Sequence, residues 1–208
     1  MTGADKRPAE RITREDVEGR REAEVLARTD LRRALLVARA IRHPWYRCQA
    51  LASVAEAMSA PQVRDAVLAE AIEAAFAQDE PNRIVCAASW PLRVMVARGH
   101  AGSARLIGRL LEAIAKEAHG LRRLDGLAAI IGPVLEFPDL RAKAWPAFLA
   151  TARASTGWRT ERIVSWMSVV LAEVDKAAAL QLLAGRSVNR FTSKARVAIA
   201  SRESKRRV

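Results

Sequence analysis

Residues 34–58 have the sequence ALLVARAIRHPWYRCQALASVAEAM, and this stretch decides the fold. An alanine- and leucine-rich segment leads into His43-Pro44, and a second alanine-rich segment follows. Proline is favoured in the first turn of a helix because its missing N–H would have no partner there in any case. The pattern therefore predicts two helices, over 31–41 and over 44–58, joined by a short turn and packed against each other.

A similar helix opening recurs along the chain at intervals of 36, 40 and 39 residues. Each copy places an arginine shortly before an apolar segment, and a further 30 residues lead to Thr192 in a degenerate last copy. The repeated arginines are Arg47, Arg83, Arg123 and Arg162. Repetition at this period marks stacked helix pairs, each of which needs its neighbours to bury its apolar face. The sequence thus predicts an all-α fold, a right-handed α-solenoid of about five antiparallel helix pairs with TPR/HEAT-like packing.

The composition favours the same fold class. Half of the 208 residues are apolar but only 5% are aromatic, and alanine, leucine, arginine and glutamate dominate, which suits helices better than strands. No apolar run approaches the roughly 20 residues that span a bilayer, and the start lacks the apolar core of a signal peptide, so we expect a cytoplasmic protein without membrane contact. We expect a disordered N-terminus over 1–12, a single helical repeat domain over 13–203 and a basic tail over 204–208.

Caps and junctions predict where individual helices begin. Thr13, Asp30 and Asp79 can each accept the free N–H groups of a following helix. We expect the helix that Thr13 opens to cover the first pair, and about eleven helices in all. Three histidines fall at helix junctions, where we expect a capping role: His43, His100 and His119. The last helix, over 188–203, should bury an apolar stripe formed by Val188, Phe191, Ala195, Ala198 and Ile199.

The stretch over 31–58 resembles the degenerate repeats of tetratricopeptide and HEAT-like arrays. Such arrays are common in bacteria, including those attached to signal-transducing STAND ATPases, and copies often have A-R-x-I-x-x-P followed by R-x-x-A-L-x-x-(V/I)-A-x-A. Here the first motif begins at Ala38 and the second at Arg47. The resemblance implies a protein-interaction scaffold or a sensor surface. ATPase activity is not implied, because this chain contains no nucleotide-binding motif of its own.

The formal charge of +12 is concentrated towards the C-terminus, where 186–208 contain eight basic side chains and one acidic one. An acidic partner should therefore favour that end. Our leading hypothesis is a non-enzymatic adaptor that docks a protein partner, itself acidic, through arginine and aromatic anchors. The residues expected to contact the partner are Trp45, Tyr46, Arg47, Arg83, Arg123, Trp158 and Arg162. A structural alternative remains open, in which the arginines bond the last carbonyls of the preceding helix or a neighbouring acid.

The alternative function is nucleic-acid binding, DNA or RNA, without reading sequence. Basic side chains would contact phosphates from the concave face and the C-terminal end. The candidate residues are Arg186, Arg190, Lys194, Arg196, Arg202, Lys205, Arg206 and Arg207. Some DNA glycosylases are built from similar basic repeats, but their catalytic aspartate and aromatic cradle have no matching positions here.

Catalytic and metal-binding motifs are missing from the sequence, so we expect no enzyme activity, no cofactor and no metal. Cys48 and Cys86 lie in apolar helical stretches and should be reduced core residues. Asp125 interrupts an apolar helix, where we expect a buried carboxylate paired with an arginine. Trp90 and Trp166 should pack in the interior.

Overall fold

The computed structural model describes the backbone of residues 11–206 and the side chains of residues 11–201. These residues form eleven α-helices and one short 3-10 helix, and no strand occurs among them. The all-α prediction is therefore confirmed. Two compact units divide the chain, Met1–Ser103 and Ala104–Val208.

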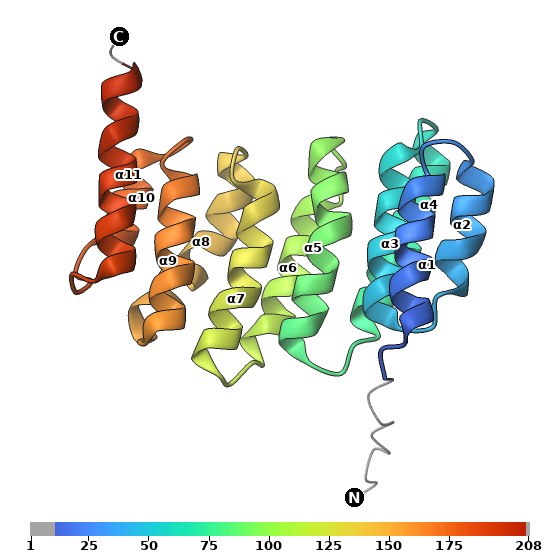
Figure 1. Ribbon diagram of the computed structural model, residues 1–208, viewed down its shortest axis with the longest axis horizontal. Coiled ribbons are helices and arrows are strands. Elements are labelled where there is room, and N and C mark those ends of the chain that lie inside the picture. The colour runs from blue at the N-terminus through green and yellow to red at the C-terminus, as the bar shows by residue number, and fades with distance from the viewer. Residues whose placement is uncertain (1–10, 207–208) are drawn as a thin grey trace, which may run out of the picture. The chain divides into compact units, whose positions relative to one another are not determined.

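The first unit contains five helices (Figure 1). They are α1 (Arg14–Leu26), α2 (Leu31–Ala40), α3 (Pro44–Ala57), α4 (Pro61–Phe76) and α5 (Pro81–Ala97). Helix α3 lies at the centre of this unit, because it packs against all four others. Its buried face carries Cys48, Leu51 and Val54, and the Cys48 Sγ donates to the carbonyl of Ala87 in α5 at 3.3 Å. Burial raises the pKa of the Cys48 thiol, which favours the neutral thiol over the thiolate.

Helix α1 covers the first pair, as predicted, since it contacts both α2 and α3. Thr13 caps it in a reciprocal arrangement: the Asp16 N–H donates to Thr13 Oγ1, and the Thr13 N–H donates to Asp16 Oδ2. Asp30 caps α2 by accepting from the N–H of Arg33. Asp79, however, is not an N-cap. The cap of α5 is Glu80, because Pro81 takes the first helical position and fixes the boundary immediately before itself.

The second unit is built mainly from the later helices. They are α6 (Ser103–Ala115), which begins at the boundary, α7 (Gly120–Ile131), the 3-10 helix η1 (Gly132–Val134), α8 (Pro138–Ala154), α9 (Trp158–Leu171), α10 (Lys176–Leu183) and α11 (Arg190–Arg206). Helix α9 contacts α7, α10 and α11, and α7 also packs on α8. Leu124, Phe148, Met167 and Leu183 are fully buried in this unit. Because α9 packs against α7, α10 and α11, the side of α9 that faces none of these helices is open to solvent.

Three predictions of burial are wrong in the second unit. Val188 is 83% exposed, because α11 begins only at Arg190, and buried Thr192 takes part in the stripe instead. Asp125 is exposed, since it lies on the side of α7 opposite to the buried Leu124 and Leu127. Trp166 is 54% exposed, on the face of α9 that points away from its neighbours.

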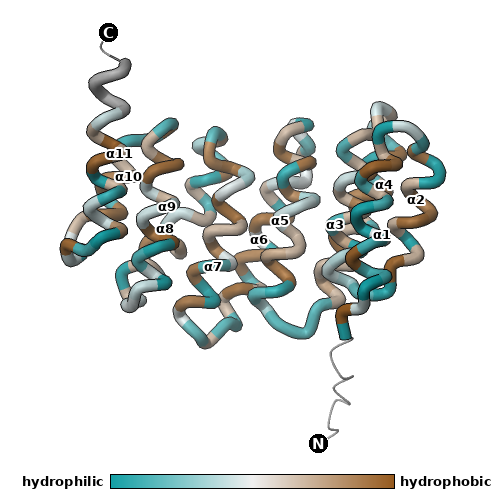
Figure 2. The backbone as a smooth tube through the Cα atoms, viewed as in Figure 1, coloured by the Kyte–Doolittle hydropathy of each residue, from teal (hydrophilic) through white to brown (hydrophobic). Residues whose placement is uncertain are grey.

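Hydropathy varies along each helix rather than between long blocks (Figure 2). Apolar and polar residues recur within single turns, which is the pattern of helices that bury one face. In the part of the chain that the structure describes, no helix combines the length and the apolarity that a membrane crossing needs.

Candidate interaction surface

Arg47 and Arg123 have the same position and the same role in their helices. Each is the fourth residue of its helix, in α3 and α7, and each donates to the carbonyl six residues earlier. Arg47 Nη1 lies 3.5 Å from the oxygen of Ile41, and Arg123 Nε lies 2.8 Å from the oxygen of Glu117. These carbonyls lie at the end of the preceding helix, where they carry partial negative charge and have no intrahelical partner. The structural explanation of the repeated arginines is thus confirmed for this pair.

Sequence analysis missed a third member of the set, Arg141. It is the fourth residue of α8, and its Nη1 donates at 2.8 Å to the oxygen of Leu135, again six residues earlier. Its Nη2 also pairs with Asp175 at 2.6 Å. The signal was present in the sequence, because Pro138 marks the helix start and Arg141 follows at the same offset as Arg47 follows Pro44.

Arg83 and Arg162 do not share this geometry, although the repeat spacing equates them with Arg47 and Arg123. Arg83 is the third residue of α5 and pairs with Glu80 at 3.2 Å, which is the neighbouring acid that the sequence allowed. Arg162 is the fifth residue of α9. A shift of one residue rotates a side chain by about 100° around a helix, so Arg162 points away from the end of the preceding helix.

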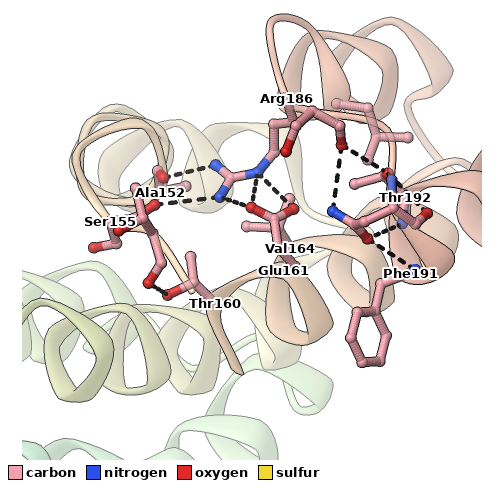
Figure 3. A network of polar contacts seen from close by, with 12 residues as sticks. Ala152, Ser155, Thr160, Glu161, Val164, Arg186, Phe191 and Thr192 are labelled. Carbon is pink, nitrogen blue, oxygen red and sulfur yellow. Dashed lines mark hydrogen bonds and ion pairs between the residues drawn. The ribbon is translucent and has the colours of Figure 1, made fainter. Parts of the chain in front are cut away.

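The carbonyls at the end of α8 are bonded by Arg186, which comes from the loop after α10 (Figure 3). Its Nη1 donates to the oxygen of Ala152 at 2.8 Å, and its Nη2 donates to the oxygen of Ser155 at 3.2 Å. The same guanidinium forms an ion pair with Glu161 at 2.5 Å, and the two side chains are only 9% and 14% exposed. Arg186 therefore joins the loop after α10 to the end of α8 and to α9.

Glu161 is held in its charged form. Its pKa lies below the usual glutamate value, mainly because Arg186 donates hydrogen bonds to its carboxylate. Burial would raise this pKa, whereas the positive charge of Arg186 lowers it further. In the first unit, burial is the largest influence on Asp16 and would raise its pKa. The hydrogen bonds from His43 and Thr13 together outweigh burial, so the pKa of Asp16 is also lowered.

Two further arginines bond helix ends in the same way. Arg98 Nη2 donates to the oxygen of Glu56 at 2.9 Å, and Arg196 Nη2 donates to the oxygen of Leu183 at 2.9 Å. At least six arginines in the part of the chain that the structure describes therefore satisfy carbonyls at the C-terminal ends of helices, where a cation also interacts favourably with the helix dipole. For these six side chains, a structural role accounts for the arginine without any ligand.

Helix α9 carries an open face of a different kind. Trp158, Arg162 and Trp166 follow one another at intervals of four residues, so they lie along one side of the helix. The two tryptophans are 56% and 54% exposed. Arg159 and Arg162 both approach the Trp158 ring, with their guanidinium carbons 5.2 and 5.5 Å from its centroid. We call these four residues the α9 face.

Of the remaining predicted anchors, Arg123 belongs to the second unit and bonds the carbonyls before α7, and the other four belong to the first unit: Trp45, Tyr46, Arg47 and Arg83. Trp45 and Tyr46 are half-buried in the opening turn of α3, where the N–H of Trp45 donates to His43 Nδ1 and the Tyr46 ring meets His43 edge-on at 5.7 Å. Trp90 is half-buried with Arg93 5.4 Å from its ring centroid. Sequence analysis therefore found two members of the α9 face, Trp158 and Arg162. It missed Arg159, and it placed Trp166 in the interior.

The basic residues proposed for nucleic acid are placed unevenly. The Arg186 side chain is only 9% exposed and Arg196 bonds a helix end, whereas Arg190 lies over the Phe191 ring at 4.6 Å and Lys194 is exposed. The side chains of Arg202, Lys205 and Arg206, and the whole of Arg207, lie outside the described residues.

The histidines act at helix junctions, as predicted. His43 and His119 are N-caps of α3 and α7, and their Nδ1 atoms accept from Trp45 and Arg122. His100 accepts from the N–H of Gly102 at 2.9 Å in the turn before α6. Within the described residues, no three histidine, cysteine or acidic side chains converge in a way that could hold a metal ion.

The first unit contains a pocket of about 450 Å³ between α1 and the end of α2. It is lined by Thr13, Glu15, Asp16, Gly19, Val37, Ala40, Ile41 and Arg42. The one buried acid among them, Asp16, is already bonded to Thr13 and His43.

Comparison with known proteins adds no relative: no protein-family model, no curated protein and no solved structure matches this chain. The geometry of its own side chains is therefore the basis for a function.

Proposed function

We propose that this chain is a non-enzymatic helical-repeat adaptor that binds a protein partner through the α9 face. In this proposal the helix pairs stack as a right-handed α-solenoid, and the partner lies along α9 in the second unit. The observation that carries the proposal is the line of Trp158, Arg162 and Trp166, in which two large aromatic side chains are more than half exposed on one helix. Tryptophan and arginine are the residue types most enriched at binding hot spots.

The charge distribution also favours a partner site in the second unit. Residues 104–208 contain 19 of the 35 basic and 9 of the 23 acidic side chains, a net charge of +10, whereas residues 1–103 have 16 basic and 14 acidic side chains, a net charge of +2. A strongly basic unit attracts acidic partners over a distance set by the ionic strength.

Rigidity supports binding at this face as well. Helix α9 packs against three neighbouring helices, and both arginines lie over the Trp158 ring. A surface that is ordered in advance loses little conformational entropy on association.

Site-specific photocrosslinking in the native cell tests this proposal. A photoreactive amino acid at Trp166 should capture a discrete protein, and an excess of the unlabelled chain should compete with that capture. The same group at Leu180, a 44% exposed position on α10, is the matched control. Capture at neither position, or equal capture at both, would contradict a partner site on α9.

Nucleic-acid binding stays as the second candidate because Arg190 and Lys194 are both exposed on α11 next to α9. Binding of that kind would weaken steeply with added salt, since phosphate contacts release counterions. Affinity measured for duplex and single-stranded oligonucleotides across a salt series tests it.

A further inference from the structure

The α9 face has two chemically distinct parts. At the start of the helix, Arg159 and Arg162 flank the Trp158 ring, and one turn beyond Arg162 the Trp166 ring is exposed. The face therefore offers two guanidinium groups beside the Trp158 ring and a second exposed indole, Trp166, one turn beyond Arg162. A ligand that fits presents an anionic group to the arginines and apolar groups to the two indole rings.

The two arginines differ from those that stabilise the fold. Arg186 and Arg141 each pair with a carboxylate, at 2.5 and 2.6 Å. Neither Arg159 nor Arg162 has such a carboxylate partner among the described residues. Stacking on an indole orients a guanidinium while leaving its N–H edge open to a carboxylate in a two-pronged hydrogen bond.

The spacing along the helix restricts the length of the ligand. Trp158 and Trp166 are eight residues apart, which corresponds to about 12 Å along the axis. An extended peptide rises about 3.3 Å per residue, so two of its side chains four residues apart span the same distance.

Resting on the proposed function of this face, we propose that its ligand is a short acidic peptide segment of the partner, with two apolar residues four apart and carboxylates between them. The apolar side chains contact Trp158 and Trp166, and a carboxylate binds Arg159 and Arg162. A peptide fits this face better than a nucleic acid does. Two cations are too few for phosphate-driven affinity, whereas one small anchored cluster is the usual size of a protein hot spot.

Fluorine NMR of the full chain labelled with 5-fluorotryptophan tests this assignment, because the chain contains only five tryptophans. Substitutions W158F and W166F assign the two signals of interest, and Trp145, which stacks on Phe148 at 5.6 Å, serves as an internal reference. The probes are a peptide of about twelve residues centred on Leu-Glu-Glu-Glu-Leu, the same peptide with glutamine for glutamate, and an oligodeoxythymidine of similar length.

The expected result is a shift of the Trp158 and Trp166 signals with the acidic peptide and little change at Trp145. The glutamine peptide and the variant Arg162→Gln should each weaken binding about tenfold. The variant Arg153→Gln, which removes the same charge from an exposed position on α8, should leave affinity nearly unchanged. Equal losses for both variants would show unspecific charge attraction and overturn the assignment, and so would tighter binding of the oligodeoxythymidine.

The two proposals fail in different ways. Crosslinking at Trp166 to a partner, combined with no response to the acidic peptide, overturns the peptide assignment and leaves the adaptor function standing. No capture at Trp166 combined with peptide binding overturns the adaptor function in the cell and leaves the chemistry of the face intact.

Discussion

The openings of α7 and α9 meet the same physical requirement with arginines from very different distances. At α7 the carbonyls of the preceding helix are bonded by Arg123, six and eight residues away in sequence. At α9 they are bonded by Arg186, 31 and 34 residues away, and Glu161 completes a buried network. The comparison shows that equivalent carbonyls need an equivalent donor, but that the donor need not come from the equivalent position in the repeat.

We therefore expect Arg186, the distant arginine, to contribute more to the free energy of unfolding than Arg123, the local one. The variant Arg186→Ala should lower the free energy of unfolding by about 3 kcal/mol, because it leaves the buried Glu161 charge and two carbonyls without their partner. Urea unfolding of the full chain measures the loss, and hydrogen exchange should show reduced protection in α8, α9 and α11. The double variant Arg186→Met with Glu161→Leu is the control, and it should recover much of the loss. A cost below about 1 kcal/mol for Arg186→Ala would show that the network does not join these helices.

Acidification should weaken the same network. The folded-state pKa of Glu161 lies below its unfolded value, so its contribution to stability is present above the ordinary glutamate pKa of about 4.3 and is lost as the pH falls through the folded pKa. Between pH 5 and pH 3 the unfolding free energy should therefore decrease more steeply in the natural chain than in Glu161→Gln. Parallel slopes in urea titrations of the two proteins would be inconsistent with a charged Glu161. Asp16→Asn provides the corresponding comparison in the first unit, since the pKa of Asp16 is also lowered.

The local arginine should have a smaller and more confined effect. Arg123→Ala removes one part-buried and one exposed hydrogen bond to helix-end carbonyls, and water can replace the exposed one, so we expect a loss of about 1 kcal/mol. Hydrogen exchange should change at the junction of α6 and α7 and remain unchanged in α11. A loss as large as that of Arg186→Ala would remove the distinction between local and distant arginines.

Arg162→Ala should have the smallest effect on stability, under about 0.5 kcal/mol, although the repeat pattern makes Arg162 the counterpart of Arg123. Its side chain is exposed and lies over the exposed Trp158 ring, a cation–π contact of modest value at a surface. Thermal unfolding of Arg162→Ala beside Arg123→Ala is the direct measurement. A larger loss for Arg162→Ala would indicate a structural role and would weaken the case for a binding face on α9.

Local sequence was sufficient wherever the physical cause is local. Thr13, Asp30 and Pro44 each act on atoms within a few residues, and the helix starts that they predict occur in the structure. Helix α8 follows the same local rule, because it begins at Pro138. The prediction that Asp79 caps α5 is wrong for an equally local reason. Pro81 takes the first helical position, so the cap is Glu80, one residue after Asp79.

Part of the candidate site was predictable and part was not. The exposed pair Trp158 and Arg162 stood out as an aromatic residue beside arginines at a helix opening, but a tryptophan in mid-helix, such as Trp166, has the same local signature whether it packs or not. Only the arrangement of α7, α10 and α11 around α9 leaves that side of the helix uncovered.

The sequence by itself determined the all-helical class, most helix boundaries and the excess of positive charge in the second half, because propensity, capping and composition act over a few residues. The tertiary structure alone decided which arginines are used inside the fold and which are presented outside it. A one-residue change in the start of a helix turns a side chain by about 100°, and a donor such as Arg186 reaches its acceptors only after three helices have packed together.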